Sequence, residues 1–162
     1  MSGTIINAGR VTGSTYKNDL LGFSITMPTD WHILGKEELE KEEINSCLFA
    51  AEEAEDRGSG KANIITDATS FPERISLTEL AQEFRERVEK TDSTVALSET
   101  KKMIGGFEFV SLKSDHDVQG VRVHQETLAC VKNNTALWFT YSWFDLEQKQ
   151  QLDNIMSTLT WD

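Results

Sequence analysis

The feature that most constrains the fold is a series of strand-like segments in the second half of the chain, joined by very short connections. An Asn-Asn pair at 133–134 and a Gly-Gly pair at 105–106 stand between such segments. Both residue types tolerate the left-handed backbone conformation that tight hairpin turns require. Strands joined by tight turns pair antiparallel, because a parallel pair needs a long crossover. The sequence therefore predicts a four-stranded antiparallel meander, with strands at 94–99, 107–113, 118–132 and 136–143.

Two amphipathic helices are predicted beside this meander. Ser76 and Glu79 have the spacing of a capping box, which satisfies two backbone N–H groups at a helix start, and the helix should reach about Lys90. Asp145 is the expected N-cap of a second helix. Apolar residues recur at helical spacing in both segments. They are Leu77, Leu80, Ala81, Phe84 and Val88 in the first helix, and Leu152, Ile155, Met156 and Leu159 in the second.

The first half of the chain contains shorter predicted elements. These are a half-buried strand at 22–27, a short acidic helix at 36–44, strands at 47–51 and 62–66, and a polar loop at 52–60. The order of strands and helices predicts an α+β fold, with an antiparallel β-sheet that carries helices on both faces. Trp138 lies on the strand face opposite to Leu137 and Phe139. We expect Trp138 either to be covered by a helix or to form an exposed contact.

The length of 162 residues fits one domain. We expect a flexible, glycine-containing lead-in at residues 1–14 and a single domain at residues 15–162. No apolar run approaches the roughly 18 residues of a membrane span. The lead-in has neither the basic region nor the apolar run of a signal peptide. The protein is therefore expected either to be cytoplasmic or to be a mature chain whose leader is absent here.

The charge balance excludes several classes of partner. The chain has 27 acidic and 16 basic residues, a formal net charge of −11, and its bases are scattered. Nucleic acid and anionic membrane surfaces repel such a chain. Nine acids lie between residues 37 and 56, which indicates either a solvated face or a docking surface for a basic protein partner. The candidate docking residues are Glu37, Glu38, Glu40, Glu42 and Glu43, with Trp138 as the alternative contact.

Asp115, His116 and Asp117 are a group of potential metal ligands. Neighbouring side chains in a strand point to opposite faces, so these three cannot converge on one ion there. We expect them to form a solvated turn between two strands. His32 and His124 have no evident carboxylate or cysteine partner in the sequence, and we expect both to be structural. No metal site is predicted.

The two cysteines form no recognisable motif. Cys47 and Cys130 are far apart in the sequence, and two cysteines without well-placed histidines cannot complete a zinc site. Each lies in an apolar segment, which favours a buried thiol, and whether the two pair stays open. No catalytic residue, cofactor-binding residue or cofactor is predicted.

The order of several short motifs resembles the PsbP-like family. An aromatic residue and an Asn precede a Gly-Phe strand, which is followed by Pro28 and Trp31. Each motif is short, but their order is maintained over residues 15 to 161. The matching segments are 16–18, 21–25, 62–65, the Ser76 helix, 105–107, Gln125, 136–140 and the helix that ends at Leu159.

The resemblance implies an α/β/α sandwich around an antiparallel sheet, used as a docking scaffold. The family is similar to photosystem extrinsic subunits, a Ran-binding import factor, DcrB-type bacterial envelope lipoproteins and small acidic chaperones of secreted effectors. It therefore implies a non-catalytic binding or accessory module of the bacterial cell envelope, exported and anchored through a segment absent here. A cytoplasmic adaptor or chaperone for a partner protein is the first alternative. A hydrolase or metal enzyme with an unrecognised site is the second. Partner identity and oligomeric state stay open.

Overall fold

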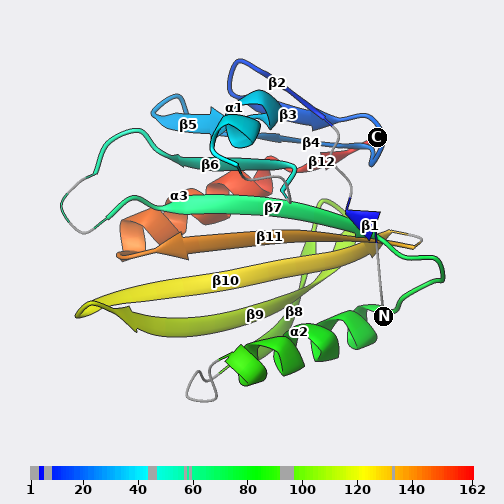
Figure 1. Ribbon diagram of the computed structural model, residues 1–162. Helices are drawn as coiled ribbons and strands as arrows, with labels where there is room; N and C mark the ends of the chain where they lie inside the picture. The colour runs from blue at the N-terminus through cyan, green and yellow to red at the C-terminus, as the bar shows by residue number, and fades with distance from the viewer. Residues whose placement is uncertain are drawn as a thin grey trace.

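The computed structural model describes residues 4–5, 9–43, 47–56, 58, 60–91, 97–132 and 134–162. Within these residues the chain forms two antiparallel sheets and three helices, an α+β fold (Figure 1). The helices are α1 (Lys36–Lys41), α2 (Leu77–Thr91) and α3 (Leu146–Ser157). The strands are β1 (Thr4–Ile5), β2 (Arg10–Thr12), β3 (Thr15–Asn18), β4 (Phe23–Thr26), β5 (Trp31–Leu34), β6 (Phe49–Glu53), β7 (Asn63–Ser70), β8 (Ser98–Ile104), β9 (Phe107–Val118), β10 (Val121–Lys132), β11 (Thr135–Trp143) and β12 (Thr160–Trp161).

The larger sheet contains the predicted meander. Its strand order is β5-β6-β7-β11-β10-β9-β8, and β1 pairs with β7. The antiparallel β10–β11 hairpin is confirmed, with Lys132 opposite Thr135 next to the turn. The first meander strand lies at 98–104 and not at 94–99, whose residues 94–96 are outside the described part.

A second, smaller sheet was not expected. Its order is β12-β4-β3-β2, so the segment predicted as a strand at 22–27 does not join the main sheet. The last strand of the chain pairs with β4, with Thr160 opposite Ser24. Strand β2 lies within residues 1–14, where no element was expected. These strands are two to four residues long, too short for an alternating pattern to be distinctive.

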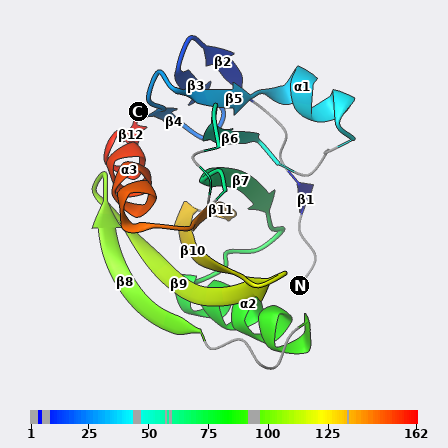
Figure 2. The same cartoon turned by 90° about the vertical axis from the view of Figure 1, so that its left-hand side faces the viewer.

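Strand β11 separates two hydrophobic cores, because its alternate side chains point to opposite faces of the sheet. Phe139 and Tyr141 belong to the first core, together with Leu152 of α3 and residues of the smaller sheet. Ala136 belongs to the second core, together with Leu80 of α2. Figure 2 shows α3 and α2 beside different parts of the curved main sheet. None of the helices in the described ranges is long and apolar enough to cross a membrane.

Both predicted helix caps are confirmed. The Ser76 hydroxyl accepts from the Glu79 backbone N–H at 3.1 Å, and the Glu79 carboxylate accepts from the Ser76 N–H at 3.0 Å. Asp145 and Gln148 form the same kind of capping box at the start of α3. The acidic helix α1 ends at Lys41, before the expected Ile44, which is outside the described residues.

The predicted loop at 52–60 was wrong at its first residues, because β6 continues to Glu53. Glu53 is buried, and its carboxylate accepts hydrogen bonds from the Ala62 backbone N–H at 3.0 Å and from the Gln148 amide at 2.7 Å. The Gln148 amide also donates to the Gly60 carbonyl at 2.9 Å. These bonds tie the start of α3 to the β6–β7 connection.

We predict that Phe139→Ala lowers the free energy of unfolding by about 3–5 kcal/mol, because this ring is fully buried between the smaller sheet and β9. The matched control is Leu146→Ala, whose side chain is 85% exposed and whose loss should change stability by less than about 0.5 kcal/mol. Urea denaturation at neutral pH measures both. Equal effects of the two substitutions would contradict the position of the core.

Candidate functional site

A group of charged side chains with a buried carboxylate at its centre lies beside α3, around Glu126 of β10. Glu126 is fully buried on the same face as Leu128 and Cys130 of the first core. A carboxylate removed from water is costly unless charged or polar donors replace the lost hydration. The contacts of Glu126 therefore decide whether it is a reactive group or a structural one.

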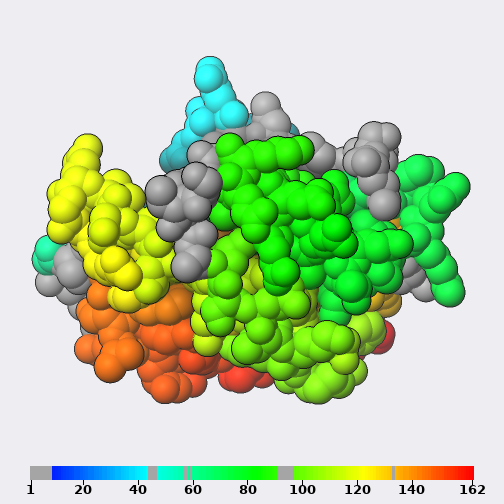
Figure 3. Space-filling model, turned by 90° about the horizontal axis from the view of Figure 1, so that it is seen from below, coloured from blue at the N-terminus to red at the C-terminus, as the bar shows by residue number. Residues whose placement is uncertain are grey.

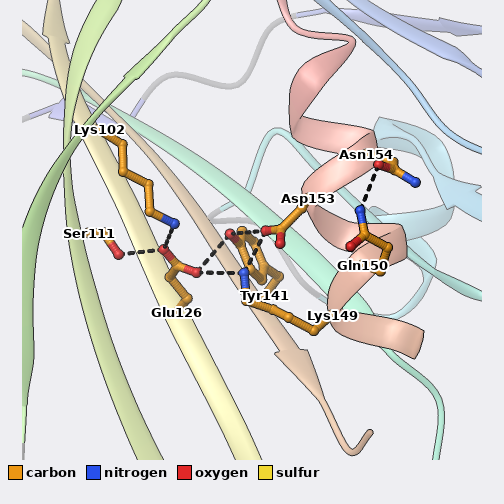
Figure 4. A network of polar contacts seen from close by, with 8 residues as sticks. All are labelled: Lys102, Ser111, Glu126, Tyr141, Lys149, Gln150, Asp153 and Asn154. Carbon is orange, nitrogen blue, oxygen red and sulfur yellow. Dashed lines mark hydrogen bonds and ion pairs between the residues drawn. The ribbon is translucent and has the colours of Figure 1, made fainter. Parts of the chain in front are cut away.

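Four donors surround this carboxylate (Figure 4). The ammonium groups of Lys102 and Lys149 lie 2.8 Å and 3.2 Å from its oxygens. The Ser111 hydroxyl also donates to it, and the Tyr141 hydroxyl donates at 2.9 Å. These donors come from β8, α3, β9 and β11, so Glu126 links four elements that are separate in the sequence.

These contacts keep Glu126 ionised. Burial raises the pKa of this carboxyl. Hydrogen bonds from Lys102 and Ser111 and the two ammonium charges outweigh burial, and the pKa falls to about 2. The same carboxylate acts in the opposite sense on Tyr141, whose pKa is raised by burial and by the negative charge of Glu126. At neutral pH the pair is therefore a carboxylate and a neutral phenol.

Lys149 extends the cluster along α3. Its ammonium group lies 2.5 Å from the Asp153 carboxylate, one helical turn away. It also lies over two aromatic rings, 5.4 Å from the centroid of Tyr141 and 5.2 Å from that of Trp143. A cation over an aromatic face is stabilised by the ring quadrupole. Lys149 thus has a fixed position between two carboxylates and two rings.

His124, for which the sequence shows no evident carboxylate partner, has one in the structure. Its Nδ1 lies 2.6 Å from the Asp115 carboxylate, and its ring stacks on Trp143 with centroids 5.6 Å apart. The two residues are nine positions apart in the sequence, and the long β9–β10 hairpin places Asp115 directly opposite His124. The hydrogen bond with His124 is the largest cause of the lowered pKa of Asp115. The positive charge of Arg122, which lies 3.4 Å from Asp115, lowers this pKa further.

The expected solvated turn at Asp115, His116 and Asp117 was also wrong, because all three lie inside β9. The turn follows at Gln119 and Gly120, both of which have positive φ. His116 bonds the Ser114 hydroxyl at 3.0 Å, on the face away from Asp115. In the described ranges, no group of three or more His, Cys, Asp or Glu side chains is placed to hold a metal ion.

His32 also has a carboxylate partner that was not evident in the sequence. Its Nε2 lies 2.9 Å from Glu38 of α1, and both side chains are about half exposed. Of the predicted docking residues, Glu38 is therefore engaged, whereas the other four are exposed on α1 or just after it. Those four are Glu37, Glu40, Glu42 and Glu43.

Trp138 lies on the α2 side of the main sheet. It is half-buried and packs on Phe84 of α2, with ring centroids 5.7 Å apart. Opposite it on β7 lies Asp67, whose pKa burial raises to about 6. In the main sheet, β7 separates β11, which carries Trp138, from β5 and β6, which α1 contacts.

The two cysteines are separate thiols, both buried. Burial raises the pKa of Cys130 to about 12, and burial with the nearby Asp67 charge raises that of Cys47. A nucleophilic cysteine needs a lowered pKa, so neither thiol has the environment of an activated nucleophile.

The sequence analysis did not identify Glu126 or Glu53 as special. A usable signal existed for Glu126, because it lies two and four residues before Leu128 and Cys130 and so shares their buried face. The identity of its donors is not readable in the same way, because Lys102, Ser111 and Lys149 lie on three other elements.

Comparison with known proteins places this site in a known fold. No family model and no curated protein matches the chain. Solved structures do match: CyanoP, the cyanobacterial PsbP from Synechocystis sp. PCC 6803, has a TM-score of 0.65 at 13% identity, over 97% of this chain and 98% of that one. The fold is PsbP-like.

Two further structures share this PsbP-like fold. LpqN, described as involved in cell envelope biogenesis of Mycobacterium tuberculosis, has a TM-score of 0.61 at 16% identity, over 98% of this chain and 90% of that one. PA94, a protein of unknown function from Pseudomonas aeruginosa, has a TM-score of 0.58 at 11% identity, over 96% and 94%. The PsbP-like resemblance seen in the sequence is thus confirmed at the level of the fold.

We predict that the free energy of unfolding of the wild-type chain falls as the pH decreases from about 4.5 to about 2. The ionised form of Glu126 stabilises the folded state, and this contribution is lost as the carboxylate is protonated. The expected loss from this group is about 3 kcal/mol. Glu126→Gln should be less stable at pH 7 and should lack this part of the decline. Urea denaturation of both chains at several pH values measures the difference, and parallel profiles would contradict it.

Proposed function

We propose that this chain is a non-catalytic binding or accessory module of the bacterial cell envelope. The observation that carries the proposal is the likeness in fold, over nearly the whole chain, to LpqN, which is described as involved in cell envelope biogenesis. CyanoP, a further protein of this fold, is similar over 98% of its own chain. We take the packing of α2 and α3 against alternate β11 side chains as the three-layer α/β/α form of this fold.

The electrostatics of the site support a non-catalytic role. A general acid or base must exchange a proton near the working pH, and Glu126 has a pKa of about 2. The His124–Asp115 pair has two of the three parts of a hydrolytic triad, but no hydroxyl or thiol in the described residues is bonded to His124. The charged groups hold elements together, as expected of a rigid scaffold.

The location can be tested with the full-length gene product in its source bacterium. An antibody raised against this domain should detect the protein in the envelope fraction. Protease added to cells with a permeable outer layer and an intact inner membrane should degrade it. Detection in the cytoplasmic fraction, protected from protease, would contradict the envelope proposal and favour the cytoplasmic adaptor. A cytoplasmic enzyme serves as the fractionation control.

The docking surface that we propose is the acidic end of α1, which would meet a basic surface on a partner protein. Glu40→Lys with Glu42→Lys should slow association with a partner identified by cross-linking, because charges at the rim of an interface act mainly on the association rate. The matched control is Glu73→Lys with Glu89→Lys, which has the same net charge and changes exposed acids on another part of the surface.

The melting temperature should be nearly unchanged in both double variants, because all four side chains are exposed. Surface plasmon resonance at low and physiological salt measures the association rate. Equal rates for the α1 variant and the wild type would contradict docking through α1. In that case Trp138→Ala becomes the next variant, as the alternative contact.

A further inference from the structure

Strand β8 forms one end of the main sheet, and its outer edge pairs with none of the described strands. Its inner edge pairs with β9 from Ser98 to Ile104. An unpaired edge presents a row of backbone N–H and C=O groups that can accept another strand. In Figure 3 the segment that contains β8, in yellow-green, lies on the molecular surface between α2 and the α3 region.

The side chains of β8 are charged and exposed in a definite pattern. Glu99 and Lys101 lie on the α2 face, because they are opposite Leu112 and Val110 of the second core. Ser98, Thr100 and Lys102 lie on the other face. Met103 is 67% exposed and shares the α2 face with Glu99 and Lys101. A free edge with an exposed apolar side chain is a site of association unless its charges prevent it.

One symmetric pairing with a second copy places opposite charges against each other. A two-fold axis perpendicular to the sheet keeps each face on its own side. One residue must therefore lie opposite its own copy, with the axis midway between the two. If that residue is Thr100, Glu99 lies opposite the partner's Lys101, and Leu97 lies opposite the partner's Met103. If the centre is Glu99 or Lys101, two like charges face each other, which is destabilising.

The pairing centred on Thr100 also continues contacts already present within each copy. Arg85 of α2 holds Glu99 at 2.6 Å, and Glu108 of β9 lies 3.6 Å from Lys101. In the dimer these pairs would join into a row of alternating sign, from Arg85 to Glu99 and on to the partner's Lys101. Complementarity of this kind is needed, because two chains with a net charge of −11 repel each other at long range.

We propose that β8 pairs antiparallel with β8 of a second copy, centred on Thr100, to give a two-fold dimer with one continuous sheet. Backbone hydrogen bonds would supply the attraction, as in other cases of strand addition to a sheet edge. The Glu99–Lys101 pairs would select the register. This inference goes beyond the proposed envelope function and does not depend on it.

The test is a charge exchange measured by sedimentation equilibrium of the 162-residue chain, from micromolar to millimolar concentration. Glu99→Lys places a lysine opposite Lys101, and Lys101→Glu places a glutamate opposite Glu99, so each variant alone should dimerise roughly tenfold or more weakly than the wild type. A mixture of the two variants should form heterodimers, because the lysine introduced in one chain then faces the glutamate introduced in the other.

The matched controls are Glu73→Lys and Lys36→Glu, which make the same charge changes at exposed positions away from β8 and should leave the dimer unchanged. Melting temperatures confirm that each variant is folded. A wild type that stays monomeric up to millimolar concentration would overturn the proposal. So would a dimer that persists in both single variants, or a mixture that shows no more association than its components.

Discussion

The alternation of side chains along β11 is the constraint on which the rest of the structure depends. Phe139 and Tyr141 point into the core that contains α3, and Ala136 points into the core that contains α2. A shift of one residue in the β10–β11 register would exchange the two sets of side chains. Most residues of β11 are therefore restricted by packing on one side of the sheet or the other.

Three carboxylates that are buried or half-buried differ in what surrounds them. Glu126 has two lysines and two hydroxyls and is held ionised. Glu53 accepts from a backbone N–H and a side-chain amide, and so fixes the start of α3. Asp67 has a pKa raised by burial to about 6. Glu126 and Glu53 both connect strands of the main sheet to α3, so these internal polar contacts have a structural role.

Much of the fold could be predicted from local sequence, and the reasons are specific. The caps at Ser76 and Asp145 rest on contacts between residues three positions apart, which the sequence shows directly. The meander rests on short turns. The smaller sheet depends on pairing between the two ends of the chain, which no local pattern reports. The partners of His124 and Glu126 were missed for the same reason, because they come from other strands and from α3.

The pairing of β12 with β4 has a consequence for the order in which the chain can fold. Trp161 packs on Phe107 and Phe23, with ring centroids 4.4 Å and 5.8 Å apart, and Lys132 lies over its ring. Strand β4, which pairs with β12, is synthesised long before Trp161. The smaller sheet and this end of the first core therefore stay incomplete until Trp161 has left the ribosome, even when the hairpins between β4 and β12 have already formed.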